Sequence, residues 1–215
     1  MGRKNQRPAG RRPQHSRASA NQELRRAVQA GRPEPFGIRR YLAHEDDADI
    51  RDTFYDYLID NEYLARLMQP RTRLHLTIMR KRELDSQLAR GLVVGYEYGR
   101  ASARIQHEIK ESHPFLIQVT YKEPRIMKRG RALVLAVEGE DMMDEVRSTM
   151  RAMASIGLRG ALRNDGFKPH ITLAEAATPL SSVDKRELLS EVGELWKPGH
   201  VINLNPLEFY PPRRD

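Results

Sequence analysis

Hydrophobic and polar positions along this chain change their period several times, and the changes predict a succession of strands and helices. Alternating or short continuous apolar runs, which are typical of strands, occur at 36–42, 74–79, 115–121, 132–137, 168–174 and 200–210. Apolar residues recur every three or four positions, as on one face of a helix, at 44–68, 83–90, 101–112, 141–156 and 182–195. We therefore expect an α+β domain.

Local signals support the ends of several of these elements. Four acidic residues between positions 45 and 49 favour the start of a helix at His44, because negative charge is stabilised near a helix N-terminus. Pro70 follows the expected end of that helix, and Ser181 or Ser182 is suited to cap the last helix. Residues 91–113, which glycines interrupt, are the hardest part of the chain to assign.

Two of the predicted strands carry the same polar pattern. His75 and Thr77 alternate with leucine and isoleucine in one strand, and His170 and Thr172 do so in another. Because successive side chains of a strand point to opposite faces, each strand offers an imidazole and a hydroxyl on the same side. Two such strands at one cleft would supply proton-transfer groups and hydrogen-bond donors for cleaving a phosphodiester without a metal.

The order of elements looks like a weak internal duplication of a helix and strand unit. Strands paired within each half, with helices outside, would make a domain of two lobes. Such pseudo-symmetry would bring the two polar strands, whose histidines lie 95 positions apart, to a shared cleft.

The formal net charge of +8 has an uneven source. Residues 1–35 contain nine Lys or Arg and two acids, which leaves a charge of +1 for the rest of the chain. Their composition, without sustained periodicity, predicts a mostly disordered basic tail before a domain at 36–215. Such a tail is suited to non-specific nucleic-acid contact, or it is a solvated extension without a specific partner.

The composition argues against cysteine-based sites, zinc sites and membrane-spanning segments. The chain has no cysteine, so disulfides, thiolate metal sites and a catalytic cysteine are excluded. No apolar run approaches the length of a membrane span, and the other five histidines lack the spacing of zinc ligands. We therefore expect a cytoplasmic monomer that contacts no membrane and uses no metal or other cofactor.

The two His-x-Thr motifs resemble those of the 2H phosphoesterase superfamily. The second motif, Phe167-Lys168-Pro169-His170-Ile171-Thr172-Leu173, is similar to that of the 2′-5′ RNA ligase branch, whose members act as RNA 2′,3′-cyclic phosphodiesterases. The resemblance covers about residues 36–210. It implies a bilobal, pseudo-twofold α+β fold in which antiparallel sheets face a central cleft and the helices lie outside.

The resemblance also implies roles for individual residues. His75 and His170 would be the catalytic pair, and Thr77 and Thr172 would hydrogen-bond the non-bridging phosphate oxygens. Arg80 and Lys81 depart from the pattern, because many relatives continue with apolar or aromatic residues there. This difference bears on which substrate the protein binds, and it does not alter the expected two-histidine chemistry.

Four further residues are candidates for substrate binding. Arg73 and Lys168 lie two positions before the histidines, where they would help to hold phosphate charge or would be solvated strand ends. Phe167 and Tyr121 would stack on a base of single-stranded RNA, or would pack in the core.

The preferred function is a metal-independent phosphodiesterase that hydrolyses 2′,3′-cyclic phosphate, or 2′-5′ linkages, in RNA or oligonucleotides. One alternative keeps the chemistry and changes the substrate to 2′-5′ oligoadenylate or cyclic oligonucleotide messengers. Another is a non-catalytic nucleic-acid-binding protein that uses the basic tail.

Deleting residues 1–35 tests the last alternative. If the tail dominates, nucleic-acid affinity collapses in the shortened protein, because its cationic contacts with phosphate are gone. Fluorescence anisotropy with a labelled RNA at fixed salt measures this loss. Unchanged affinity, or phosphodiesterase activity with EDTA present, contradicts the binding-protein reading.

Overall fold

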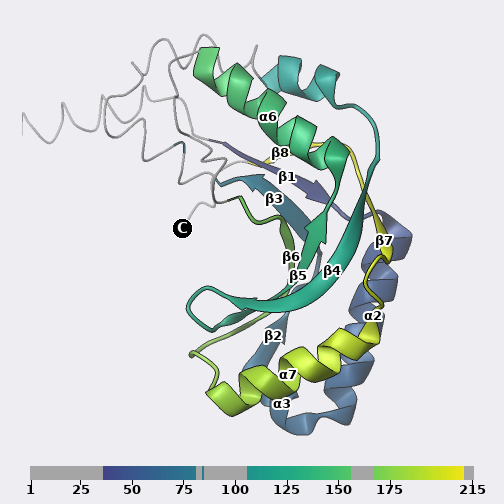
Figure 1. Cartoon of the computed structure of the whole chain (residues 1–215), viewed down its shortest axis with the longest axis vertical. Helices are drawn as coiled ribbons and strands as arrows, with labels where there is room; N and C mark the ends of the chain where they lie inside the picture. The colour runs from purple at the N-terminus through teal and green to yellow at the C-terminus, as the bar shows by residue number, and fades with distance from the viewer. Residues whose placement is uncertain (1–35, 81–83, 85–105, 156–166, 211–215) are drawn as a thin grey trace, which may run out of the picture. The chain divides into compact units, whose positions relative to one another are not determined.

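The computed structural model describes residues 36–80, 84, 106–155 and 167–210, and the basic tail lies outside this part of the chain. Its elements are shown in Figure 1 and run in chain order as β1 (Gly37–Tyr41), α2 (His44–Asp60), α3 (Glu62–Leu67), β2 (Met68–Pro70), β3 (His75–Met79), β4 (Ile117–Met127), β5 (Ala132–Glu138), α6 (Glu140–Ser155), β6 (His170–Ala176), α7 (Ser182–Leu195), β7 (Val201–Leu204) and β8 (Glu208–Tyr210). The expected mixture of helices and strands is confirmed.

The strands form one curled antiparallel sheet in the order β7-β4-β5-β6-β3-β1-β8, with β2 paired to β6. Strands β7 and β8 stand at opposite ends of this order, although only residues 205–207 separate them in the sequence. A bridge between Leu42 and Leu204 brings the end of β1 to β7. The sheet therefore curls until its two halves approach each other again.

One hydrophobic core holds the helices on a single face of the sheet. It joins apolar residues of the sheet to apolar residues of the helices: Leu76, Leu133, Leu135 and Ile171 from strands, Ile50 and Phe54 from α2, Val146 and Met153 from α6, and Leu188 and Val192 from α7. In Figure 1 the helices lie on the outer side of the curled sheet. The architecture is thus the expected antiparallel one, with helices outside and the other sheet face left for polar groups.

Three predicted elements differ from the observed ones. The helix expected at 44–68 ends at Asp60, because Asn61 leaves helical geometry (φ −121°, ψ 78°) and its side chain accepts a hydrogen bond from the Leu64 backbone as the cap of α3. The strand expected at 115–121 is longer, since β4 begins at Ile117 and continues to Met127.

The strand expected at 200–210 is two strands, β7 and β8, separated around Pro206, which cannot donate a hydrogen bond to a ladder. The helix expected at 83–90 lies outside the described residues except for residue 84, and the described part of 101–112, residues 106–112, is helical. Among the described residues, no helix is both long and apolar enough to span a lipid bilayer.

Acidic residues in the first turn of α2 also accept hydrogen bonds from neighbouring strand segments. Asp47 accepts a hydrogen bond from the backbone N–H of Leu74 at 2.8 Å, immediately before β3. Asp46 accepts hydrogen bonds from the backbone and side-chain nitrogens of Asn203 at 3.0 and 2.9 Å. The first turn of α2 therefore fixes where β3 begins.

A buried ion pair connects β1 to α6. Arg40 is 0% exposed, and its Nε donates to the Glu145 carboxylate at 2.7 Å. One of its terminal nitrogens donates to the backbone carbonyls of Phe115 at 2.9 Å and Asn205 at 2.7 Å. Burial raises the pKa of Glu145, and the hydrogen bond and charge of Arg40 oppose this shift. The guanidinium thus satisfies groups from three segments that are distant in sequence.

Replacing Arg40 with methionine is expected to lower the free energy of unfolding by about 3–5 kcal/mol, because it leaves a buried carboxylate without its partner. Urea denaturation followed by circular dichroism measures the change. The control is Arg66→Met, since Arg66 pairs with Glu62 on the surface with 74% of its side chain exposed, and should change stability by less than about 1 kcal/mol. Equal effects of the two substitutions would contradict this role of Arg40.

Candidate active site

The two polar strands are neighbours in the sheet. β3 and β6 are antiparallel, and Leu76 lies opposite Ile171. This pairing sets His75 beside Thr172, and Thr77 beside His170. Since Leu76 and Ile171 are fully buried in the core, the four polar side chains lie on the other face of the sheet, where each is partly exposed. The structure therefore brings the two predicted motifs together.

The geometry of this pair is symmetric. An antiparallel pair has a local twofold axis, here through Leu76 and Ile171, that exchanges one motif with the other. His75 and His170 are diagonal neighbours across it, and such neighbours lie roughly 7–8 Å apart. Two imidazoles at that spacing can contact one phosphate group from two sides.

The backbone orients both imidazoles. Nδ1 of His170 lies 2.6 Å from the carbonyl oxygen of Lys168. His75 has a corresponding hydrogen bond with the backbone of Arg73. Because a carbonyl only accepts, Nδ1 of His170 carries the proton, and Nε2 is the nitrogen that remains for proton transfer. The residues two positions before the histidines thus act through their backbone.

His75 lies in a positive environment that favours its neutral form. Burial and the positive charges of Arg39, Arg71 and Lys128 together lower the pKa of His75 to about 4, whereas the backbone hydrogen bond of Arg73 opposes the shift. His75 is therefore neutral at pH 7 and able to accept a proton.

His170 is shifted in the same direction. Its pKa is lowered first by burial and then by the charges of Arg80 and Lys128, and the hydrogen bond with Lys168 opposes the shift. A surface with several cations around two imidazoles attracts anions, and a bound anion would raise the pKa of both rings.

Arg39 and Tyr41 flank the first motif and were missed by the sequence analysis. On β1, Tyr41 pairs with His75, and Arg39 pairs with Thr77. The Tyr41 ring meets the His75 ring edge to face at 5.7 Å, while the Arg39 guanidinium lies 4.4 Å from the Tyr41 centroid and 4.6 Å from that of Tyr210. Their alternate spacing indicated a shared face, but the register with β3 was needed to place them at the site.

The other candidates for substrate binding occupy different surroundings. The Arg73 guanidinium lies 3.4 Å from the Tyr41 ring centroid, with 58% of its side chain exposed. Lys168 is exposed beside His170 in the sequence. Phe167 is partly buried and packs against the core. Arg73 and Lys168 remain candidates for phosphate contact. Phe167 instead fits the alternative in which it packs against the core.

Tyr121 lies on the wrong face of the sheet to stack on a substrate at the histidines. It pairs with Val137, which faces the core, and it is only 2% exposed. Its ring packs edge to face on Trp196 at 6.4 Å. The expectation of a stacking role for Tyr121 is therefore corrected, and the core alternative fits.

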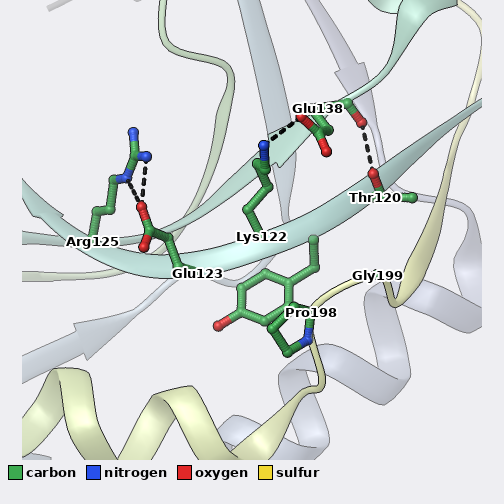
Figure 2. Close-up of a pocket in the computed structure, with 8 residues that line it drawn as sticks. Thr120, Lys122, Glu123, Arg125, Glu138, Pro198 and Gly199 are labelled. Atoms are coloured by element: carbon green, nitrogen blue, oxygen red, sulfur yellow. Dashed lines mark hydrogen bonds and ion pairs between the residues drawn. The ribbon is translucent and has the colours of Figure 1, made fainter.

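A separate hollow lies beside β4, as Figure 2 shows, with a volume of about 390 Å³. Its charged groups are paired with each other, Lys122 with Glu138 at 2.6 Å and Arg125 with Glu123 at 2.6 Å. No histidine is among the described residues that line it. The proton-transfer groups therefore belong to the β3–β6 face.

No family model matches this sequence, and no curated protein matches it. Among solved structures, the chain is similar to Escherichia coli LigT in its apo form, with 14% identity over 83% of this chain and 88% of that chain and a TM-score of 0.50. It is similar to E. coli LigT complexed with 3′-AMP, with 15% identity over the same shares and a TM-score of 0.50. The MHV ns2 PDE domain matches with 14% identity over 82% of this chain and 99% of that chain and a TM-score of 0.46.

At this identity the similarity to LigT establishes the fold, and that fold is the one of the 2H phosphoesterases. The resemblance on which the sequence analysis relied is thereby confirmed at the level of fold.

Replacing Arg39 with methionine is expected to raise the pKa of His75 by several tenths to about one unit, because one positive charge is removed from beside the ring. An NMR titration of the His75 ring measures it. Arg147→Met, on the exposed side of α6, is the control and should leave that pKa unchanged. A pKa that stays constant or falls in the Arg39 variant contradicts this account.

Proposed function

We propose that this chain, which has the fold of the 2H phosphoesterases, is a metal-independent phosphodiesterase that hydrolyses 2′,3′-cyclic phosphates at RNA ends or in oligonucleotides. The observation that carries the proposal is the pairing of Leu76 with Ile171, which sets two imidazoles and two hydroxyls on one cationic face. A similar structure, E. coli LigT, has been solved in complex with 3′-AMP, and this supports a nucleotide as the ligand.

The lowered pKa values of the two histidines indicate which one acts as the general base and which as the general acid. His75, with a pKa of about 4 and three cations acting on it, is the base that takes a proton from the attacking water. His170 is the acid, because its pKa is lowered less than that of His75, so the negative phosphate that raises both pKa values protonates His170 more readily. Water forms a new bond to phosphorus, the bond to the 2′ or 3′ oxygen breaks, and that oxygen receives the proton of His170.

The groups around the histidines stabilise the charge that develops on phosphate. Thr77 and Thr172 donate hydrogen bonds to the non-bridging oxygens, since each is adjacent to the histidine of the other strand. Arg39, held between the rings of Tyr41 and Tyr210, provides a positive charge opposite Thr77. These donors are in place before substrate arrives, which lowers the cost of reorganisation in the transition state.

The substitutions His75→Ala and His170→Ala test this mechanism. Each is expected to reduce kcat by about 10²–10⁴-fold on a 2′,3′-cyclic nucleotide in the presence of EDTA, because a general base or a general acid is lost. The control is His107→Ala, which removes a histidine with 75% of its side chain exposed and should retain full turnover. Full activity in both single variants would refute two-histidine catalysis.

A panel of substrates at fixed salt then separates the proposal from its alternative. The proposal predicts that kcat/KM is highest for 2′,3′-cyclic phosphates. A higher value for 2′-5′ oligoadenylate or for a cyclic oligonucleotide would assign the same chemistry to a messenger-degrading enzyme. Product analysis by chromatography shows which oxygen leaves.

A further inference from the structure

The turn between β4 and β5 combines positive charge with an unusual backbone. Lys128 and Arg129 have φ angles of 51° and 59°, and Gly130 follows with φ 90°. Long side chains adopt this left-handed region at an energetic cost, and such residues concentrate where a protein binds ligands. The turn is fastened to the chain after β6, because the Leu180 N–H donates to the Gly130 carbonyl at 2.9 Å.

The backbone conformation at Gly130 favours glycine. Its φ of 90° strains any residue with a side chain, and an added Cβ would lie 2.8 Å from the end of the Lys185 side chain. The close approach adds the ammonium of Lys185 to the cations at the turn.

A pocket of about 260 Å³ opens beside this turn and is called here the hairpin pocket. It is lined by Gln69, Lys128, Arg131, Glu175, Ala176 and Ala177. Lys128 forms an ion pair with Glu175, and Arg71 contacts the same carboxylate at 2.7 Å. Two cationic side chains therefore pair with a single carboxylate and Arg131 also lines the pocket, so the excess positive charge favours an anionic ligand.

The hairpin pocket continues the face that carries the histidines. Ala132 and Ala136 share one face of β5, and they pair with Glu175 and His170 respectively. Glu175 follows Thr172 on β6 by three positions, or roughly 10 Å of strand. The charge of Lys128 also lowers the pKa of both His75 and His170. A ligand bound between the histidines would therefore extend next into this pocket.

The chemistry of the lining favours phosphate over a base. No aromatic side chain is among the described residues that line the hairpin pocket, whereas single-stranded bases are commonly bound by stacking on aromatic rings. Lysine and arginine side chains are the usual partners of backbone phosphates.

We infer that the hairpin pocket binds a second phosphate of the same strand, so that the enzyme prefers an oligonucleotide end to a cyclic mononucleotide. This inference rests on the proposed function, and it names the substrate class. Arg131 and Lys128 hold the second phosphate, and Glu175 keeps Lys128 and Arg71 in place until the substrate arrives.

The test compares a 2′,3′-cyclic mononucleotide with a dinucleotide that has the same cyclic end and one internucleotide phosphate. In the wild type, KM is expected to be roughly tenfold lower for the dinucleotide. In Arg131→Gln this advantage falls roughly three- to tenfold, and the slope of log KM against log salt for the dinucleotide falls by about 0.7, as expected for one lost phosphate contact on a single strand.

Arg129→Gln is the matched control. Arg129 lies in the same turn as Arg131 and carries the same charge, but it does not line the pocket. This variant should leave both KM values and the salt slope unchanged. If Arg131→Gln does not fold, Lys128→Gln is expected to reduce the advantage of the dinucleotide in its place.

These outcomes distinguish a failure of the second phosphate site from a failure of the proposed function. Equal KM values for the two substrates in the wild type, or an advantage that survives both pocket substitutions, overturn the inference while cyclic phosphate hydrolysis stands. An equal loss in Arg129→Gln overturns it as well, since the effect would then be general charge. If no substrate is turned over by the wild type, the proposed function fails and the inference fails with it.

Discussion

The backbone pairing of Leu76 with Ile171 is the constraint on which the arrangement of this protein depends. It joins the two halves of the sheet at the strands that carry the motifs, and it turns two apolar side chains into the core. A slip of β3 by one residue against β6 would send His75 and Thr77 into that core and expose Leu76, so the two motifs would no longer share a face. The hydrophobic effect that selects this register for folding therefore also selects the face on which the polar groups meet.

The same alternation gives two consecutive arginines opposite roles. Arg40 points into the core, where it satisfies Glu145 and backbone carbonyls from distant segments. Arg39 points to the other face, between two tyrosine rings and beside the histidine motif. One guanidinium holds α6 against the sheet, and the other contributes to the positive field of the site. A short strand thereby links the stability of the fold to the electrostatics of the site.

The sequence predicted the features that local spacing determines, and it missed those that depend on pairing between distant strands. The alternation around His75 and His170 is local, so the strands and the shared face of each motif were predictable. Arg39, Tyr41 and Lys128 approach the histidines only through the register of β1 and the turn after β4. Tyr121 illustrates the converse, because its face follows from the pairing of β4 with β5. The break at Asn61 was hidden because apolar spacing continues across it.

The pairing of β8 with β1 has a consequence for biosynthesis. Residues Gly37–Tyr41 leave the ribosome long before their partner, Glu208–Tyr210, because every other described element is made between them. During translation β1 therefore presents an open edge, which is a surface prone to pairing with other chains. The ring of Tyr210 also completes the stack around Arg39. The newly made chain accordingly acquires the full electrostatic environment of its histidines only after β8 has been synthesised.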